Sequence, residues 1–527
     1  MVRKIGLPTT NKTAFADTRY STRLVTQKRV SIASNCCENI VILFSLEGQK
    51  WIEGLTGEKM PHELRFTGIR PWERDPMVNA DRALRSAYPE SLVLPDREKL
   101  NEVTEMYFNT ILCRFWPLLD EEFFRETVDI AYGSQPETPL RVHSAKICVL
   151  AMWAFTSAAP SSTHLTRPQR GEIMAAIMAS INLLQQPHVE LLEATAMLVT
   201  FHLFSGNIQA GVMSNALAAR YVLWLGGNTR DSYYNACEFM TTGNEQCRRD
   251  HHLRNLFWIC YQQDKELCLR SGQPPTLSEY NCDLSLPLGW ERAYNISLTE
   301  EKFESPVFPG DLRLSQIKSK AYIDLYSRRA LEKDGALILG DIRQLDADLE
   351  QWRMQIPADY RPTLLFSQDT TQMPGRLNIR SLMIRLEYHY CMSYIHQACA
   401  RFGAASGAQD QETQGVSSSL TLAIAACRSS LYYLVAVQHT LFVRDFWLTL
   451  FYPLSAILTL FCYLISNPTD SEAFNDLEVI KQIAGQIREL GQEEGKLSGE
   501  ASQPEHVWKV VMALHDLAKR TVEKRQP

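Results

Sequence analysis

The sequence lacks a surplus of positive charge. Its 527 residues include 54 Lys or Arg and 60 Asp or Glu, which gives a formal net charge of -6. A protein that holds the phosphate backbone of DNA electrostatically needs a basic surplus, so DNA binding by this chain alone is not favoured. Because hydrophobic residues make up 45% and charged residues 22% of the chain, as in ordinary globular proteins, we expect a packed fold.

A secretory leader and a disulfide framework are also missing. No long apolar segment follows the N-terminal methionine, and the 13 cysteines are scattered. Many of them, such as Cys260 and Cys462, stand inside apolar runs, where cysteine behaves as a small hydrophobic residue. We therefore expect reduced core thiols and an intracellular compartment.

Catalytic and metal-binding motifs are absent as well. The sequence has no Gly-x-Ser-x-Gly, His-Glu-x-x-His or Gly-x-Gly-x-x-Gly element. The phosphate-loop look-alike at 491–497 has the wrong glycine spacing and is interpreted as a solvated turn. His251 and His252 project in different directions and are predicted to start a helix at the surface, while Cys36 and Cys37 have no further thiols nearby. The sequence thus nominates no catalytic, metal-binding or DNA-contacting residue and leaves any cofactor-binding residue unknown.

One long uncharged run, 446–466, approaches the length of a membrane span. Polar Thr449, Ser455 and Thr459 dilute this run, and Pro453 interrupts it. Because a helix that is apolar all round can also lie inside a protein, we predict a buried core helix. We expect no second such run and no membrane attachment.

The chain divides at about residue 95. Residues 1–95 alternate short apolar pieces with Gly, Pro and charge and are predicted to be a partly disordered N-terminal arm without a zinc cluster. Residues 96–527 repeat apolar positions at helical spacing, with glycine breaks at 206–207 and 226–227, and predict an all-α domain. A surface loop is expected at 404–419, and no internal repeat is evident.

A carboxylate lies on the core-facing stripe of the helix predicted around residue 258. That stripe contains Leu253, Leu256, Phe257, Cys260, Tyr261, Asp264, Leu267 and Cys268. An unpaired buried carboxylate is costly, so Asp264 is expected to accept hydrogen bonds from an arginine or from backbone amides of the turn at Gly272. No second titratable group accompanies Asp264 at a useful spacing, which favours a structural role over a catalytic one.

Residues 251–287 resemble the signature of the fungal-specific transcription factor regulatory domain, the middle homology region of zinc binuclear cluster transcription factors. The matching residues are Arg254, Trp258, Tyr261, Asp264, Gly272, Pro274, Asp283 and Pro287. Gln273 stands where the family usually has Arg. A weaker similarity extends from about residue 100 to the end of the chain.

The resemblance implies a multi-helix regulatory domain and a nuclear transcription regulator, not an enzyme, that controls a metabolic or secondary-metabolite pathway. Family members usually bind two zinc ions in an N-terminal six-cysteine cluster, whereas residues 1–100 contain only two cysteines. The resemblance therefore implies that this chain binds no zinc cofactor. It also implies that contact with DNA is indirect or is made by a module outside this chain. It also implies a homo- or heterodimer with a DNA-bound regulator, and a small-molecule effector.

Two points stay open at the level of the sequence. A helical ligand-binding or enzymatic protein can retain the same fold without any DNA-related function. The basic groups at 19–29 and 519–525 fit nuclear import signals, although short groups of this kind are more often solvated surface.

Overall fold

The computed structural model describes residues 46–64, 93–134, 136–157, 165–181, 186–229, 245–300, 305–366, 378–401, 410–438, 446–498 and 502–525. Every regular element in these residues is a helix, which confirms the all-α prediction. The predictions for Cys36, Cys37 and the basic group at 19–29 lie outside the described residues.

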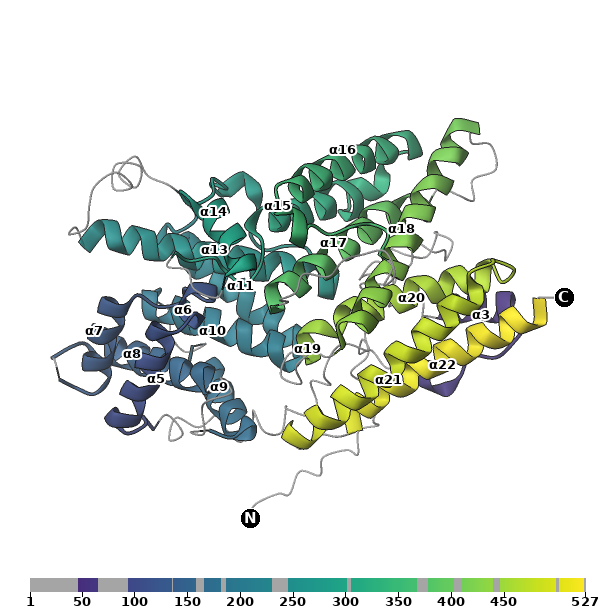
Figure 1. Ribbon diagram of the computed structural model, residues 1–527. Coiled ribbons are helices and arrows are strands. Elements are labelled where there is room, and N and C mark those ends of the chain that lie inside the picture. The colour runs from purple at the N-terminus through teal and green to yellow at the C-terminus, as the bar shows by residue number, and fades with distance from the viewer. Residues whose placement is uncertain are drawn as a thin grey trace, which may run out of the picture.

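The first group of helices forms one end of the molecule (Figure 1). It consists of α5 (Arg97–Asn109), α6 (Leu112–Phe115), α7 (Glu121–Ala131), α8 (Pro139–Thr156), α9 (Arg167–Ile181), α10 (Val189–Ser205) and α11 (Ile208–Leu225). Asp120 fixes the start of α7, because its side chain accepts the free backbone amides of Glu122 and Phe123. Gly206 and Gly226 end α10 and α11 in the left-handed conformation, which confirms the predicted break at 206–207 and the predicted cap at 226–227.

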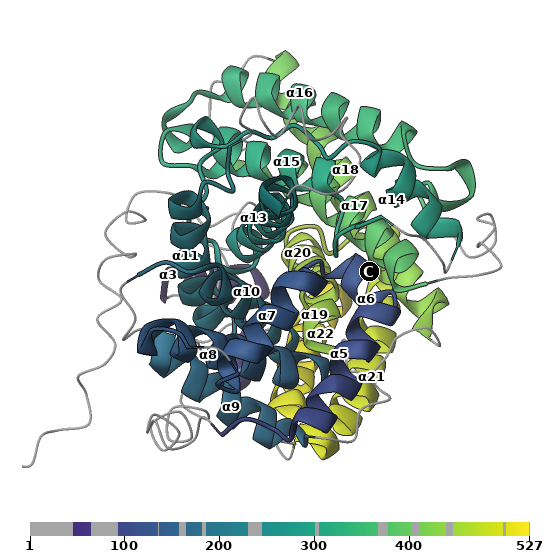
Figure 2. The same ribbon diagram turned by 90° about the vertical axis from the view of Figure 1, so that its left-hand side faces the viewer.

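The middle group is built around a long helix that packs against α10 and α11. Its α-helices are α13 (Glu245–Ser271), α14 (Trp290–Thr299), α15 (Leu312–Ala321), α16 (Gly335–Met354), α17 (Ile379–Gln397) and α18 (Asp410–Ala436). Its short turns are η4 (Glu279–Asn281), η5 (Tyr322–Tyr326), η6 (Ala330–Glu332), η7 (Ala358–Tyr360) and η8 (Ala398–Arg401). Helices α17 and α18 pack along each other, as both views show (Figure 1, Figure 2).

The last group joins the C-terminal helices to a segment from the start of the chain. It comprises α19 (Phe446–Thr449), α20 (Phe451–Ser466), α21 (Ala473–Ser498), α22 (Ser502–Arg525), α3 (Leu46–Thr56) and η2 (His62–Leu64). Although α3 and η2 fall within the predicted N-terminal arm, they pack on α20 and α22 and bury Ile52 and Leu64. Residues from all three groups share a continuous apolar core.

The uncharged run is buried, but it is not one helix. Pro453 has no amide to donate to Thr449, and its ring crowds the carbonyl of that residue, so the chain breaks between α19 and α20. Two stretches, Gly415–Ala436 and Phe446–Ser466, are long and apolar enough to cross a membrane, which corrects the expectation of only one. In the second, 89% of the apolar window is buried inside the protein, as the prediction of a core segment requires.

Two predicted irregular segments are helical instead. Within the expected loop at 404–419, α18 begins at Asp410, because Val416 is buried and Gly415 packs against Leu339. The expected turn at 491–497 lies inside α21, where Gly491 packs closely against Pro504. Tertiary packing overrides the weak helix propensity of glycine at both places.

Candidate functional site

The signature resemblance falls mainly on α13, which is buried almost all round from His252 to Ser271. Trp258 is 0% exposed and lies edge-on to both Phe257 and Tyr261. This confirms that the Trp258 segment packs inside the helical body. Because the helix also carries charged residues into this interior, each of them needs a partner there.

Asp264 is the centre of one buried polar cluster. Its carboxylate accepts hydrogen bonds from the backbone amides of Thr276 (2.8 Å) and Leu277 (3.1 Å). Asn215 Nδ2 donates to it at 2.9 Å and Lys265 Nζ at 3.0 Å. Of the two predicted alternatives, the backbone amides of the turn are the donors present; the side-chain donors are an asparagine and a lysine.

Lys265 is buried as deeply as the carboxylate that it pairs with. Its ammonium also donates to the carbonyl of Leu277 at 2.6 Å and lies 4.5 Å from the ring centroid of Tyr261. The Tyr261 hydroxyl in turn donates to Glu279 at 3.0 Å. Asp264 and Lys265 together fasten the turn after α13 to the helix itself.

Arg254 fastens a second stretch of chain to α13. Its guanidinium stacks over Phe257, 4.4 Å from the ring centroid, and over Trp258, at 5.3 Å. It donates to the carbonyls of Gly227, Asp283 and Ser285. These carbonyls belong to the end of α11 and to the segment after η4, so a single arginine holds three parts of the fold together.

The remaining signature residues shape the chain around these two clusters. Gly272 ends α13 with a φ of +72°, a value that favours glycine. Pro274 is exposed, as is Gln273, which stands at the family's usual Arg position. Asp283 accepts the amide of Ser285 at 2.7 Å, and the Pro287 carbonyl accepts the amide that begins α14, at 3.1 Å.

A further charged cluster, which we call the Glu266 cluster, links α13 to α15, α17 and α20. It contains Glu266, Arg270, Lys318, Glu387 and Tyr452. Lys318 Nζ lies 3.0 Å from Glu266 and 2.9 Å from Glu387. Although burial opposes ionisation, the Lys318 ammonium and Arg270 guanidinium lower the pKa of Glu266 to about 2. Burial raises the pKa of Glu387, although the Lys318 ammonium beside it favours the charged form.

His252 is buried, which corrects the prediction that the two histidines start a helix at the surface. Its Nε2 lies 2.6 Å from Glu193 Oε1 on α10, and the Cys148 thiol on α8 donates to the other oxygen of Glu193 at 3.2 Å. Burial raises the pKa of the Glu193 carboxyl and raises that of the Cys148 thiol well above its usual range. The cluster holds α8, α10 and α13 together and contains no activated thiolate.

Metal chemistry gains no support within the described part of the chain, where no group of three His, Cys, Asp or Glu residues is placed to hold an ion. Nine cysteines there form no disulfide bond, and eight of these are buried, as expected for core thiols. Cys247 departs from that expectation because it is disulfide-bonded.

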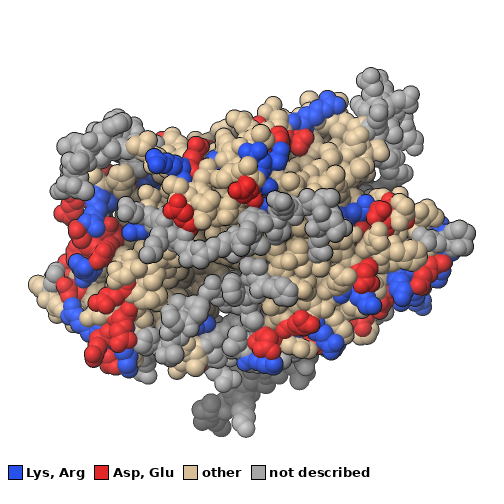
Figure 3. Space-filling model, viewed as in Figure 1, with Lys and Arg blue, Asp and Glu red and all other residues tan. Residues whose placement is uncertain are grey.

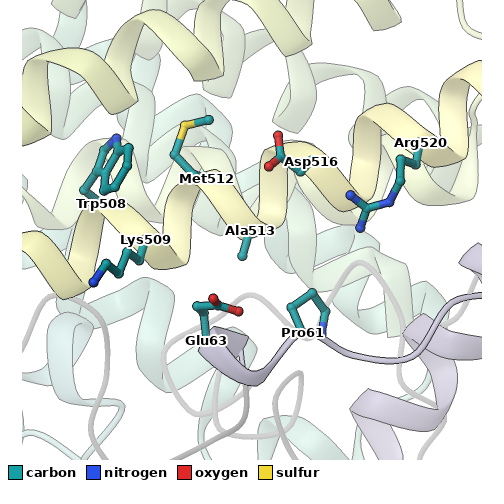
Figure 4. A pocket seen from close by; sticks show the side chains of 8 residues that line it. All are labelled: Pro61, Glu63, Trp508, Lys509, Met512, Ala513, Asp516 and Arg520. Atoms are coloured by element: carbon teal, nitrogen blue, oxygen red, sulfur yellow. The ribbon is translucent and has the colours of Figure 1, made fainter.

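A shallow groove of about 300 Å³ lies away from α13, between η2 and α22 (Figure 4). It is lined by Pro61, Glu63, Trp508, Lys509, Met512, Ala513, Asp516 and Arg520. Nearby, Arg520 and Lys524 of the predicted basic group at 519–525 pair with Glu58 at 2.7 and 2.6 Å. On the face shown in Figure 3, basic and acidic side chains are interspersed.

Four of the signature residues lie on α13 and the other four on the stretch that follows it, but sequence reasoning missed most of their partners. Asn215, Glu193 and Lys318 come from distant helices that carry no local sign of pairing. The consecutive charges at 264–266 on an otherwise apolar helix were the one available signal. Such a run inside a core helix predicts several buried partners rather than one.

Comparison with known proteins gives the same family that residues 251–287 resemble. Residues 104–354 match the fungal specific transcription factor domain. The chain is 25% identical over 538 residues to an ABC-transporter-regulating transcription factor of Aspergillus oryzae and, over the same length, to one of Aspergillus fumigatus. Each match covers 94% of this chain and 57% of the relative, so the chain spans little more than half of these curated relatives.

A shorter match, 30% identical over 111 residues, covers 21% of this chain and 20% of the Fusaridione A cluster transcription factor of Fusarium heterosporum. No solved structure matches the chain.

Proposed function

The chain carries a fungal specific transcription factor domain over residues 104–354, and from this premise we propose that it is the regulatory part of a transcription factor. The observation that carries the proposal is the extent of the likeness. It runs beyond the domain to 94% of the chain in two ABC-transporter-regulating transcription factors. The family consists of transcription factors, which are not enzymes.

The genes under control are those of a metabolic or secondary-metabolite pathway, including genes for membrane export. Export is suggested by the two relatives that align over nearly the whole chain, because both are described as regulators of ABC transporters. Secondary metabolism is suggested by the Fusaridione A cluster factor, which aligns over a shorter stretch.

Recognition of DNA falls to a homodimeric or heterodimeric partner that is already bound, or to a zinc cluster outside this chain. The net charge of -6 supports this assignment, since the chain brings no basic surplus to DNA. The body responds to a small-molecule effector and works in the nucleus, in keeping with a family of transcription factors.

The arrangement of α13 supports a body that acts as one unit. The helix contacts α10, α11 and α15 directly, and Arg270 donates to the Leu448 carbonyl of α19 at 2.9 Å. A structural change at any of these contacts is therefore transmitted to α13 through packed residues and not through a flexible linker. This is the property that a regulatory body needs if it is to transmit a signal.

A tethering assay tests the proposal. The full chain is fused to an unrelated DNA-binding module and expressed in a filamentous fungus with a reporter that carries the module's sites. We expect reporter output to change several-fold relative to the module alone. The change should disappear in Trp258→Ala, which empties the core, and persist in Arg343→Ala, which alters an exposed position of α16. A well-expressed fusion that leaves the reporter at the level of the module alone would refute the proposal.

A further inference from the structure

Arg385 on α17 is a buried cation without a counter-charge. It is 3% exposed, and its one hydrogen bond within the described residues is long, from Nη2 to the carbonyl of Asp359 at 3.4 Å. Among the described residues, its Nε has no hydrogen-bond partner and no carboxylate forms an ion pair with it. Burial of an uncompensated charge is among the most costly arrangements in a folded protein.

Other buried arginines of the described core have more polar partners. Arg270 pairs with Glu266 at 2.7 Å, and Arg313 pairs with Asp311 at 2.6 Å. Arg380 also lacks a carboxylate partner, but it donates to the carbonyls of Val307 and Phe308. Of these four buried arginines, Arg385 therefore has the fewest polar partners.

Two neighbours of Arg385 also have unused polar atoms. Tyr433 on α18 is fully buried, its ring centroid lies 5.6 Å from Arg385 Cζ, and its hydroxyl has no partner. His389 follows one turn along α17, and its Nε2 donates to the carbonyl of Thr363 at 2.9 Å. That bond leaves a lone pair on Nδ1, which is buried and has no donor.

We propose that Arg385, Tyr433 and His389 form a binding site for a small 2-hydroxycarboxylate. The chemistry follows from what the three side chains leave unsatisfied. Arg385 Nε and the Tyr433 hydroxyl are two donors that lack an acceptor, and a carboxylate supplies both the acceptor and the missing negative charge. His389 Nδ1 is an acceptor that lacks a donor, and a hydroxyl next to the carboxylate supplies it.

The segment over these residues keeps the site dry. Phe366 packs edge-on against Tyr433 with ring centroids 5.4 Å apart, and its amide donates to Ser429 on α18 at 3.1 Å. An apolar cover lowers the local dielectric and strengthens the attraction between a guanidinium and a bound anion. Binding at this site rests on the three unsatisfied side chains, whereas its use as the effector site rests on the proposed function.

Calorimetric titration of the purified full chain tests the site, with glycolate, acetate and glycolamide as probes at constant ionic strength. Glycolate should bind to one site. Acetate, which lacks the hydroxyl, should bind about 10-fold more weakly, the loss expected for one hydrogen bond. Glycolamide, which lacks the charge, should not bind measurably. Arg385→Met should weaken glycolate binding about 10- to 100-fold, whereas Arg343→Met on the exposed face of α16 should leave it unchanged.

The Met variant is expected to fold, because an apolar side chain replaces an uncompensated charge. Circular dichroism should therefore give it an unfolding midpoint equal to or above that of the wild type without ligand. Equal glycolate affinity in wild type and Arg385→Met would overturn the site, as would a wild type that binds neither carboxylate. If glycolate binds but the tethered chain does not change reporter output, the binding site is supported and the proposed function is refuted. Failure of the site and failure of the proposed function are therefore distinguishable.

Discussion

Asp264→Ala should be one of the most destabilising single substitutions in this chain. The carboxylate is 3% exposed and accepts four hydrogen bonds, two of them from backbone amides. Alanine leaves those amides unpaired and leaves Lys265, which is 1% exposed, with a buried charge and only the Leu277 carbonyl as a hydrogen-bond acceptor. Removal of one partner of a buried ion pair costs about 3–5 kcal/mol, and we expect a loss of that size in the free energy of unfolding.

Urea unfolding followed by tryptophan fluorescence measures this loss. Glu300→Ala, at an exposed position that ends α14, is the matched control and should change the free energy of unfolding by about 0.5 kcal/mol or less. The double variant Asp264→Leu with Lys265→Met should recover most of the stability, because it removes both buried charges together. An Asp264→Ala protein within about 0.5 kcal/mol of the wild type would refute the assigned role of this carboxylate.

Three further outcomes are expected. Gly206→Ala should destabilise the protein more than Gly226→Ala. Both glycines have a positive φ, but only the Cβ added at 206 would meet a neighbour, the Trp447 ring at 2.6 Å. Thermal melts should show that the two variants differ in stability by about 1–3 kcal/mol. Lys318→Met should cost about 3–5 kcal/mol in urea unfolding, because it removes the cation that pairs with buried Glu387, whereas Glu266 keeps Arg270. Burial lowers the pKa of His202 from 6.5 to about 4, so the unfolded chain takes up the proton first as pH falls. Stability should therefore decline from about pH 6.5 to 4 by up to ~1.4 kcal/mol per pH unit, and His202→Leu should flatten that decline in unfolding curves measured across the range. A similar loss in both glycine variants, a neutral Lys318→Met or an unchanged pH slope would contradict the respective prediction.

Local signals in the sequence were sufficient wherever neighbours along the chain decide the structure. Gly206 and Gly226 end their helices because glycine alone takes a positive φ without strain. The stripe around Trp258 is buried because apolar residues at helical spacing share one face. Because Asp264 lies on that buried stripe, its carboxylate needs hydrogen-bond donors, and two of these are amides of the turn that follows.

The sequence was insufficient wherever distant segments decide the structure. Nothing near Glu266 indicates that a lysine 52 positions away will neutralise it. The helical path of the chain through Gly415 and Gly491 depends on side chains from other segments that cover these glycines. Arg385 could not be distinguished from any other helical arginine until its surroundings showed the missing counter-charge.

Transcript profiling of a deletion strain tests the central claim most directly. The strain is complemented either with the intact gene or with a version that carries Trp258→Ala, and all three are compared with the parent. We predict altered transcripts that include export or secondary-metabolite genes, restored by the intact gene and not by the variant. Transcripts that stay unchanged on deletion under both basal and challenged growth would contradict the assignment of this helical body to transcriptional control.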